Sequence, residues 1–336
     1  MNKRELSGGR IGWLDLLRGF GIILVVIGHA QMNNEALRAW IYSFHMPLFF
    51  FAGGWLYRQK EVLADLKQRV FTLLLPYLSF GVVTLLYWQL FERRFRPSEL
   101  EFSDAILGLF TARHDLLEFN VFLWFLPCFF VVTVGYNALH RLGGKKLAVG
   151  VTALLAVVYA LLDLPELPLC LERVCKFSVF YAVGHLLSGV EADEKLRKIP
   201  AAARAGLAVV LMAAGFWVSS MGLTQGILWW YAMAVVGLAG AILLCLTLPA
   251  WRVITYLGRI SLVILCVHGP VYRIPFQGLS MVLNLSTAYL REHPVSLLLV
   301  TAITLAVCAV AYEVLVRVLP WMVGKRKKQK EPAQVA

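Results

Sequence analysis

Two ionisable side chains, eleven residues apart, interrupt an otherwise apolar run near the start of the chain. The stretch RGFGIILVVIGHA begins with Arg18 and contains His29, and only Gly, Phe, Ile, Leu and Val lie between them. At about 100° per residue, this spacing places both side chains on one face of a helix, about 16 Å apart along its axis. A histidine can exchange a proton near neutral pH, and a guanidinium can hold an anionic group. The pair is therefore a candidate functional site inside the membrane.

Asp15 precedes Arg18 by three residues, close enough for a partial ion pair on the same helix. A structural alternative requires no chemistry: Arg18 reaches the membrane interface and His29 is a satisfied core histidine. Ionisable groups inside a membrane are costly and commonly functional. The shared face of Arg18 and His29 therefore favours function.

Two other apolar segments carry a histidine beside a proline. His45 lies in SFHMPLFFFAGG, two residues before Pro47, and His268 lies just before Gly269-Pro270. Because the helices alternate in direction, we expect His29, His45 and His268 at a similar depth. The alternatives are a packing kink with an incidental histidine and a three-histidine metal site, for which no ligand spacing gives support. A polar cavity that opens outward fits better, and no metal site is predicted.

Three further residues are candidates with simple structural alternatives. Lys67 and Arg69 precede the apolar stretch VFTLLLPYLSF, where a bias of positive charge toward the cytoplasm would also explain them. Trp124 in LWFLPCFF could equally be an interfacial aromatic residue.

Composition places the chain in a membrane. Of its 336 residues, 60% are hydrophobic and only 15% are charged, whereas soluble proteins carry about 25% charged residues. The net charge of +12 comes from short clusters of Lys and Arg between apolar runs, which is typical of cytoplasmic loops and gives no indication of nucleic-acid binding. The six cysteines have no metal-binding spacing, and a disulfide between Cys170 and Cys175 is left open.

The sequence predicts an all-α, polytopic integral membrane protein with about ten transmembrane helices and both termini in the cytoplasm. The predicted spans are residues 11–30, 39–57, 70–91, 121–139, 147–162, 173–190, 205–221, 226–249, 254–270 and 295–318. We expect a membrane domain over residues 1–324 and a basic cytoplasmic tail over 325–336.

The loop after the third span does not follow the charge bias. Arg93, Arg94 and Arg96 would lie outside, so either the loop turns back toward the membrane or these arginines act at the outer face. The loop, residues 92–120, could also carry an amphipathic segment around FSDAILGLF.

Five segments resemble the acyltransferase-3 family of membrane acyltransferases, which includes sugar O-acetylases of the fucose-4-O-acetylase type. WLDLLRGFGIILVVIGH is similar to the R-x10-H signature, and SFHMPLFFFAGG is similar to the second-helix block. KQRVFTLLLPYL, LWFLPCFF and LGRISLVILCVHGP resemble the later blocks in family order. The basic entry of the family often has a second arginine, whereas this chain has Lys67, which can hold phosphate only as a point charge.

The resemblance implies an integral membrane O-acyltransferase of the cell inner (plasma) membrane. Such an enzyme would move an acyl group, with acetyl as the expected one, from cytoplasmic acyl-CoA to a hydroxyl of a cell-envelope sugar or lipid-linked glycan. Acetyl-CoA would be a co-substrate, and no permanently bound cofactor is expected. The partners implied are the lipid bilayer, acyl-CoA and the envelope carbohydrate, with no nucleic acid.

The roles follow from this chemistry. His29 would be the general base, or alternatively a transient acyl carrier. Arg18 would hold acyl-CoA or stabilise the thioester oxyanion, and Asp15 would orient Arg18. Lys67 and Arg69 would meet the CoA phosphates. The acceptor would contact the remaining candidates, which are His45, His268, Trp124, Arg93 and Arg94. A transporter or flippase for a small anion or glycolipid is the alternative.

Overall fold

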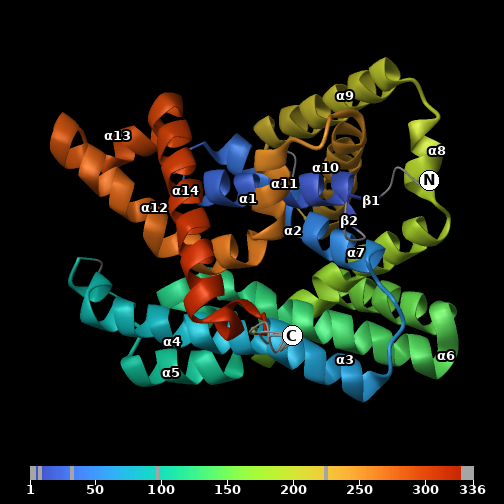
Figure 1. Ribbon diagram of the computed structural model, residues 1–336, viewed down its shortest axis with the longest axis horizontal. Coiled ribbons are helices and arrows are strands. Elements are labelled where there is room, and N and C mark those ends of the chain that lie inside the picture. Colours follow the sequence, from blue (N-terminus) through green and yellow to red (C-terminus); the bar gives the residue numbers. More distant parts are fainter. Residues whose placement is uncertain (1–4, 7–9, 31–33, 96–97, 223–225, 327–336) are drawn as a thin grey trace, which may run out of the picture.

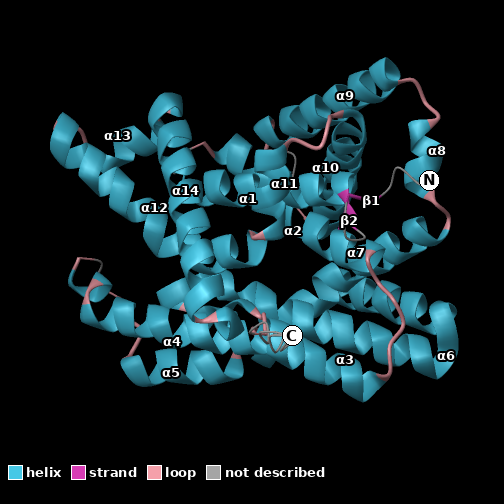
Figure 2. Ribbon diagram, viewed as in Figure 1, coloured by secondary structure: helices cyan, strands magenta, loops and turns pink. Residues whose placement is uncertain are grey.

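The computed structural model describes residues 5–6, 10–30, 34–95, 98–222 and 226–326. Within them the fold is helical apart from one short antiparallel pair of strands, β1 (Glu5–Leu6) and β2 (Arg10–Ile11), just before the first helix. Figure 2 shows these two strands in magenta beside the helices. The all-α class predicted from the sequence is confirmed.

Fourteen α-helices and six short helical turns make up the described chain. The α-helices are α1 (Gly12–Ala30), α2 (Glu35–Trp55), α3 (Val62–Arg69), α4 (Leu75–Leu90), α5 (Phe102–Thr111), α6 (Phe125–Leu161), α7 (Leu171–Gly189), α8 (Ala192–Arg197), α9 (Ala201–Ser220), α10 (Ile227–Thr247), α11 (Arg252–Arg259), α12 (Ser261–Leu283), α13 (Thr287–Glu292) and α14 (Pro294–Val318). The shorter turns are η1 (Val70–Leu74), η2 (Glu92–Arg94), η3 (His114–Leu116), η4 (Glu118–Trp124), η5 (Pro168–Cys170) and η6 (Pro320–Val323).

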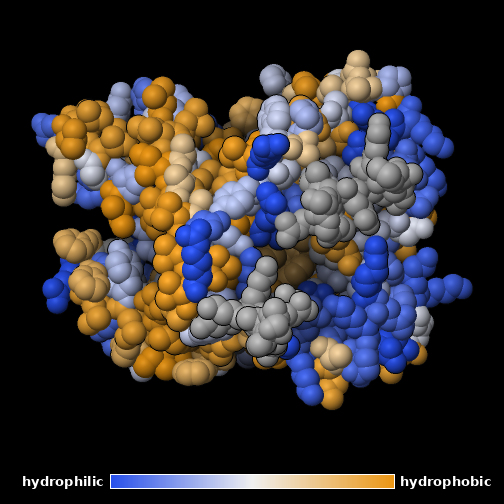
Figure 3. Space-filling view, in the orientation of Figure 1, coloured by the Kyte–Doolittle hydropathy of each residue, from blue (hydrophilic) through white to orange (hydrophobic). Residues whose placement is uncertain are grey.

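Seven helical stretches of the described chain are long and apolar enough to cross a membrane. Their outward faces are apolar: α14, for example, exposes Leu298, Val307, Val310 and Val314. In Figure 3 apolar side chains cover the face formed by α4, α12 and α14, while hydrophilic side chains gather around α8 and the nearby end of α6. The molecule is therefore a multi-pass membrane protein. The count of ten spans and the cytoplasmic location of both termini stay predictions.

Helix α6 explains part of the difference between the seven candidate membrane spans of the structure and the ten predicted from the sequence. It covers 37 residues, but Gly143 and Gly144 inside it have non-helical backbone angles, with φ of +71° at Gly144. Glycine adopts a positive φ without the steric cost that a Cβ would add. The two predicted segments 121–139 and 147–162 lie on either side of this break.

The loop after α4 contains the predicted amphipathic segment, which forms helix α5. The hydroxyl of Tyr77 on α4 donates to the carbonyl oxygen of Leu109 on α5 at 2.8 Å. α5 is therefore held against α4.

Helix α1 lies in the middle of the molecule, in contact with α2, α10, α11, α12 and α14. Figure 1 shows α3 to α6 along one side of the molecule and α9 to α14 along the other. Helix α2 joins the parts, since it packs against α1, α7, α9 and α10. The side chains on α1 therefore face other helices on most sides.

Glycines allow the closest of these helix contacts. A Cβ at Gly54 of α2 would lie 1.8 Å from the carbonyl oxygen of Tyr181, and one at Gly184 of α7 would lie 2.1 Å from that of Phe51. The same pairing occurs between α1 and α11, where Gly19 meets the carbonyl of Ile254 and Gly258 meets that of Asp15. Small residues at such positions let helix backbones approach closely in membranes.

We predict that Gly54→Ala destabilises the protein by about 1–3 kcal/mol or more, because the added methyl group meets backbone that cannot move aside. The matched control is Gly135→Ala on α6, where no atom lies within 4 Å of the new Cβ. This control should be neutral or slightly stabilising, because Ala favours helix over Gly. Thermal unfolding of both variants in detergent measures the effect. Equal midpoints for Gly54→Ala and the unchanged protein would contradict the close contact.

Candidate functional site

A cavity of about 240 Å³ lies between α1, α2, α6 and α12, with two guanidinium groups in its wall. We call it the arginine pocket, and its polar wall is formed by Arg18, Arg69 and Ser261. The rest of the wall is mainly apolar and aromatic and includes Phe49 and Phe125. Two cations in an otherwise apolar cavity suit an anionic or strongly polarised ligand with an apolar portion.

Local breaks in the helices place the groups around Arg18. α11 ends at Arg259 and α12 starts at Ser261, whose hydroxyl accepts a hydrogen bond from Arg18 Nη2 at 3.2 Å. Asp15 Oδ1 lies 4.0 Å from Arg18 Nη1, as expected from the spacing of three residues. Because Arg18 remains about 30% exposed, it is held in place while still facing the cavity.

Arg69 reaches the same pocket from another part of the chain. It is the last residue of α3, directly before the π-helical turn η1, and its Nε lies 3.3 Å from Asp65 Oδ1 on the same helix. Lys67 is exposed and lines a separate cavity with Gln68 and Arg326. The structure thus brings Arg69, but not Lys67, to Arg18.

His29, His45 and His268 form one cluster. The ring centroids of His29 and His268 are 5.6 Å apart, and those of His29 and His45 are 6.5 Å apart. His45 and His268 are buried, whereas His29 is half-buried. Among the described residues, no group of three or more His, Cys, Asp or Glu side chains is arranged to hold a metal ion.

Hydrogen bonds define the orientation of each ring. His45 Nδ1 lies 2.8 Å from the carbonyl oxygen of Ile41, and His268 Nδ1 lies 2.9 Å from that of Ile264. A carbonyl oxygen can only accept, so in both rings Nδ1 carries the proton and Nε2 keeps its lone pair. In the described part of the chain, the buried Nε2 of His268 has no hydrogen-bond partner.

Tyr42 contacts the ring of His29 and can favour the same tautomer there. Its hydroxyl donates to the carbonyl oxygen of Gly28 at 3.1 Å and lies 2.7 Å from His29 Nδ1. When the hydroxyl donates to Gly28, it accepts from the Nδ1–H of His29. The Nε2 atom of His29 then carries the lone pair that a general base requires.

Phe122 covers the other side of the cluster. Its ring centroid lies 4.4 Å from that of His29 and 4.3 Å from that of His268. Gly269 permits this contact, because a Cβ there would lie 2.4 Å from the Phe122 ring. Beyond Phe122 is a second cavity of about 320 Å³, which we call the asparagine pocket and which is lined by His114, Asp115, Glu118, Phe119, Asn120, Val121, Phe122, Gly269, Pro270 and Arg273.

None of the three histidines lines either cavity. The arginine pocket reaches Met46, next to His45, and Leu265, one turn before His268. The asparagine pocket begins at Gly269 and at Phe122, whose ring packs on His29 and His268. The cluster is therefore close to residues of both walls, and the two cavities share no lining residue.

Three further predicted residues line neither of these cavities. The Trp124 ring stacks on Phe177 at 5.5 Å and has the Arg173 guanidinium over it. Arg93 donates to the carbonyl oxygen of Leu100 at 2.9 Å and lies over the ring of Trp88, and Arg94 is exposed. Arg96 lies outside the described residues. The acceptor roles of Trp124, Arg93 and Arg94 stay predictions.

Sequence reasoning missed Tyr42, Phe122 and Asn120. Tyr42 precedes His45 by three residues, a spacing that places both on one helix face and that could have revealed it. Phe122 and Asn120 lie in the 3₁₀ turn η4, where no helical period applies. Ser261 lies in the segment LGRISLVILCVHGP quoted for the family resemblance, but its contact with Arg18 depends on the packing of α11 against α1.

A family model described as "Acyltransferase domain" matches residues 11–313. The chain belongs to the acyltransferase-3 family. Comparison with curated proteins gives no match, and neither does comparison with solved structures. Family membership confirms the resemblance carried by the Arg18–His29 segment and the later blocks, and it implies that this membrane protein is an acyltransferase.

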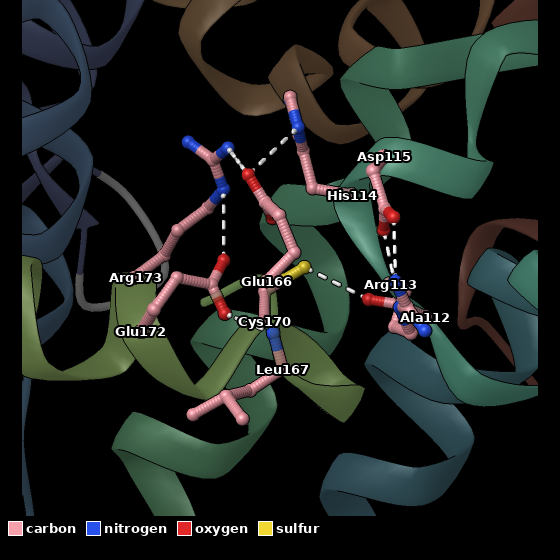
Figure 4. Close-up of polar contacts among 9 residues, drawn as sticks. All are labelled: Ala112, Arg113, His114, Asp115, Glu166, Leu167, Cys170, Glu172 and Arg173. Carbon is pink, nitrogen blue, oxygen red and sulfur yellow. Dashed lines mark hydrogen bonds and ion pairs between the residues drawn. The ribbon is translucent and has the colours of Figure 1, made fainter. Parts of the chain in front are cut away.

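In this acyltransferase-3 chain, a polar cluster supports the wall of the asparagine pocket at His114 (Figure 4). The carboxylate of Glu166 lies 3.3 Å from Arg173 Nη2 and 3.7 Å from His114 Nδ1. Glu172 lies 3.2 Å from Arg173 Nε and accepts from the backbone N–H of Leu167. These contacts connect the turn η3 to the start of α7.

The same region excludes the disulfide that the sequence left open. All six cysteines are free, and the Sγ of Cys170 donates to the carbonyl oxygen of Ala112 at 2.9 Å (Figure 4). The thiol therefore takes part in a local hydrogen bond between the two loops instead of a bond to Cys175.

His114 is held neutral in this cluster. Burial lowers its pKa from 6.5 to about 4, and the nearby Arg173 acts in the same direction, against smaller opposite effects of Glu166 and Asp115. Burial also raises the pKa of Glu166 above its usual value. The imidazole that lines the asparagine pocket is thus uncharged at neutral pH.

We predict that His114 makes the fold less stable in mild acid. Below pH 6.5 the unfolded chain binds a proton at this position before the folded chain does, so stability falls as the pH drops from 6.5 towards 4. His114→Gln should therefore lose less of its thermal midpoint between pH 7.5 and pH 5 than the unchanged protein. The control is His293→Gln, which removes an exposed histidine. An equal loss in all three proteins would contradict this prediction.

Proposed function

We propose that this protein is an O-acyltransferase of the plasma (cell inner) membrane. It would move an acyl group, with acetyl as the expected one, from cytoplasmic acyl-CoA to a hydroxyl of a cell-envelope sugar or a lipid-linked glycan. The observation that carries the proposal is the position of His29 in a cluster of imidazoles, on the helix whose Arg18 lines the arginine pocket and 4.4 Å from the Phe122 ring that lines the asparagine pocket. Family membership supports the acyl-transfer chemistry.

Acyl-CoA would enter the arginine pocket. Arg18 and Arg69 supply the positive charge there, and the apolar wall suits the pantetheine arm and the acyl chain. Lys67 of α3 and Arg326, which follows η6, line a separate cavity and would meet the nucleotide phosphates outside the pocket. Since Arg18 lies about 16 Å from His29 along α1, it is better placed to hold the donor than to contact the reacting carbonyl. Asp15 and Ser261 would orient Arg18.

His29 would act as the general base. Its Nε2 removes the proton of the acceptor hydroxyl while the hydroxyl oxygen attacks the thioester carbonyl. The carbon–sulfur bond then breaks, the acyl group stays on the acceptor oxygen, and the thiolate of CoA takes the proton from the imidazolium. Tyr42 supports this role when its hydroxyl donates to Gly28, because it then accepts from the Nδ1–H of His29 and leaves the lone pair on Nε2. Transient acylation of His29 is the alternative course, with the same net reaction.

A transporter or flippase is the second candidate, and one observation favours it. Two separate cavities near one group of intramembrane histidines would also suit alternating access to a small anion or glycolipid. Acyl transfer requires only the acyl group to pass from one cavity to the other, whereas transport requires the whole ligand to pass. Label from acetyl-CoA that appears on sugar supports the enzyme. Label that moves only across an intact membrane supports the transporter.

We predict that His29→Ala abolishes acyl transfer while the protein still inserts and folds. Loss of a general base typically costs about 10²–10⁴-fold in rate. The assay measures transfer of labelled acetyl from acetyl-CoA to envelope glycan in membranes that contain equal amounts of each protein. The control His293→Ala removes an exposed histidine and should leave the rate unchanged. Retained activity in His29→Ala would refute the assignment of the base.

We predict that Arg18→Lys raises the KM for acetyl-CoA about tenfold. Lysine keeps the charge but loses the planar fork that contacts Ser261 and the donor together. The control is Arg317→Lys, the same change at an exposed position paired with Glu313. An unchanged KM for acetyl-CoA in Arg18→Lys would refute the donor role of Arg18.

A further inference from the structure

The asparagine pocket is separate from the proposed donor cavity and meets the histidine cluster at the ring of Phe122. We propose that it is the acceptor site and that it binds an uncharged, polyhydroxylated sugar ring through the side chain of Asn120, above the ring of Phe122. This inference rests on the proposed function, whose acceptor is a sugar hydroxyl, and assigns it a specific site.

The lining of the pocket has the chemistry of a sugar site. His114, Asp115, Asn120 and Arg273 present planar polar groups, which can bind neighbouring hydroxyls in pairs. Phe122 presents an aromatic ring, against which the apolar face of a sugar can pack. The volume of about 320 Å³ suits a small ligand.

Asn120 carries a buried acceptor that the described residues do not use. The residue is only 3% exposed, and its Nδ2 donates to the carbonyl oxygen of Cys266 on α12 at 2.9 Å. Its Oδ1 has no hydrogen-bond partner among the described residues. A buried polar atom without a partner is costly, and a ligand hydroxyl that donates to it would remove this cost.

The charges around the pocket are largely compensated within the protein. Arg273 forms an ion pair with Glu92, and Asp115 forms one with Arg113 at 2.6 Å. His114 is uncharged, and the Glu118 carboxylate accepts from the Ser98 hydroxyl at 2.7 Å. Figure 4 shows Asp115 turned towards Arg113 and His114 turned towards Glu166. A pocket with paired charges favours an uncharged polyol over a phosphate or a carboxylate.

Phe122 connects the pocket to the chemistry. Its ring lines the pocket, and its centroid lies 4.4 Å from that of His29. A sugar placed on this ring is one aromatic side chain away from the proposed base. A rotation of the Phe122 side chain would let a hydroxyl of the bound sugar reach His29.

The test measures binding of defined probes to the full-length protein in lipid nanodiscs by saturation-transfer NMR. The probes are methyl α-D-glucopyranoside, methyl α-L-rhamnopyranoside and, as the anionic comparison, glucose 1-phosphate. Asn120→Leu removes the polar group, and Val121→Phe reduces the pocket volume without changing a polar residue. Asn120→Leu should weaken glycoside binding at least about tenfold, the effect expected when one buried hydrogen bond is lost. Val121→Phe should weaken it by a similar factor because the larger ring takes up space that the sugar needs.

The matched control is Asn137→Leu. Asn137 is equally buried but bonds to Tyr57 and Lys60, away from the pocket, so its replacement should leave glycoside binding unchanged. The proposal is overturned if neither glycoside binds the unchanged protein, if both pocket variants bind as well as it does, or if the phosphate binds better than the glycosides.

Acetyl transfer measured on the same samples separates this inference from the proposed function. Glycoside binding that depends on Asn120, without transfer from acetyl-CoA, would leave the pocket in place and refute the acyltransferase. Transfer to sugar that is insensitive to both pocket variants would support the enzyme and refute the asparagine pocket as its acceptor site.

Discussion

The structure depends on the enclosure of α1 by other helices. Hydrocarbon cannot solvate a guanidinium or an imidazole, so a spanning helix that carries both must be surrounded by protein. Of the apolar stretch of α1, 67% is buried inside the protein, whereas only 17% of the apolar stretch of α9 is buried. α1 thus occupies the place where polar side chains are tolerated, and α9 has the outward-facing position of an ordinary lipid-exposed helix.

The enclosure also determines the geometry of the site. Gly19 and Gly258 let α1 and α11 meet backbone to backbone, and the start of α12 follows directly. This close approach places the hydroxyl of Ser261 within 3.2 Å of Arg18. A larger residue at either glycine would therefore move the polar group that positions the arginine. Helix packing and the proposed donor binding would depend on the same contact.

The sequence predicted the features that follow from local period and composition. The helices, the face shared by Arg18 and His29, and the convergence of three histidines all depend on spacing along a helix or on alternating helix direction. Arg69 was identified from its place before an apolar run, but the separation of Lys67 from Arg69 depends on the rotation of α3 and could not be predicted. The asparagine pocket joins η3, η4 and α12, which are up to 160 residues apart in the chain, so no local pattern could reveal it.

The two separate cavities have a direct consequence for the proposed reaction. Donor and acceptor would occupy different cavities, and neither would need to enter the cavity of the other. The burial of His45 and His268 limits the access of water to the half-buried His29. A thioester held there is protected from hydrolysis until a hydroxyl reaches Nε2 of His29, which is the condition that transfer to a sugar requires.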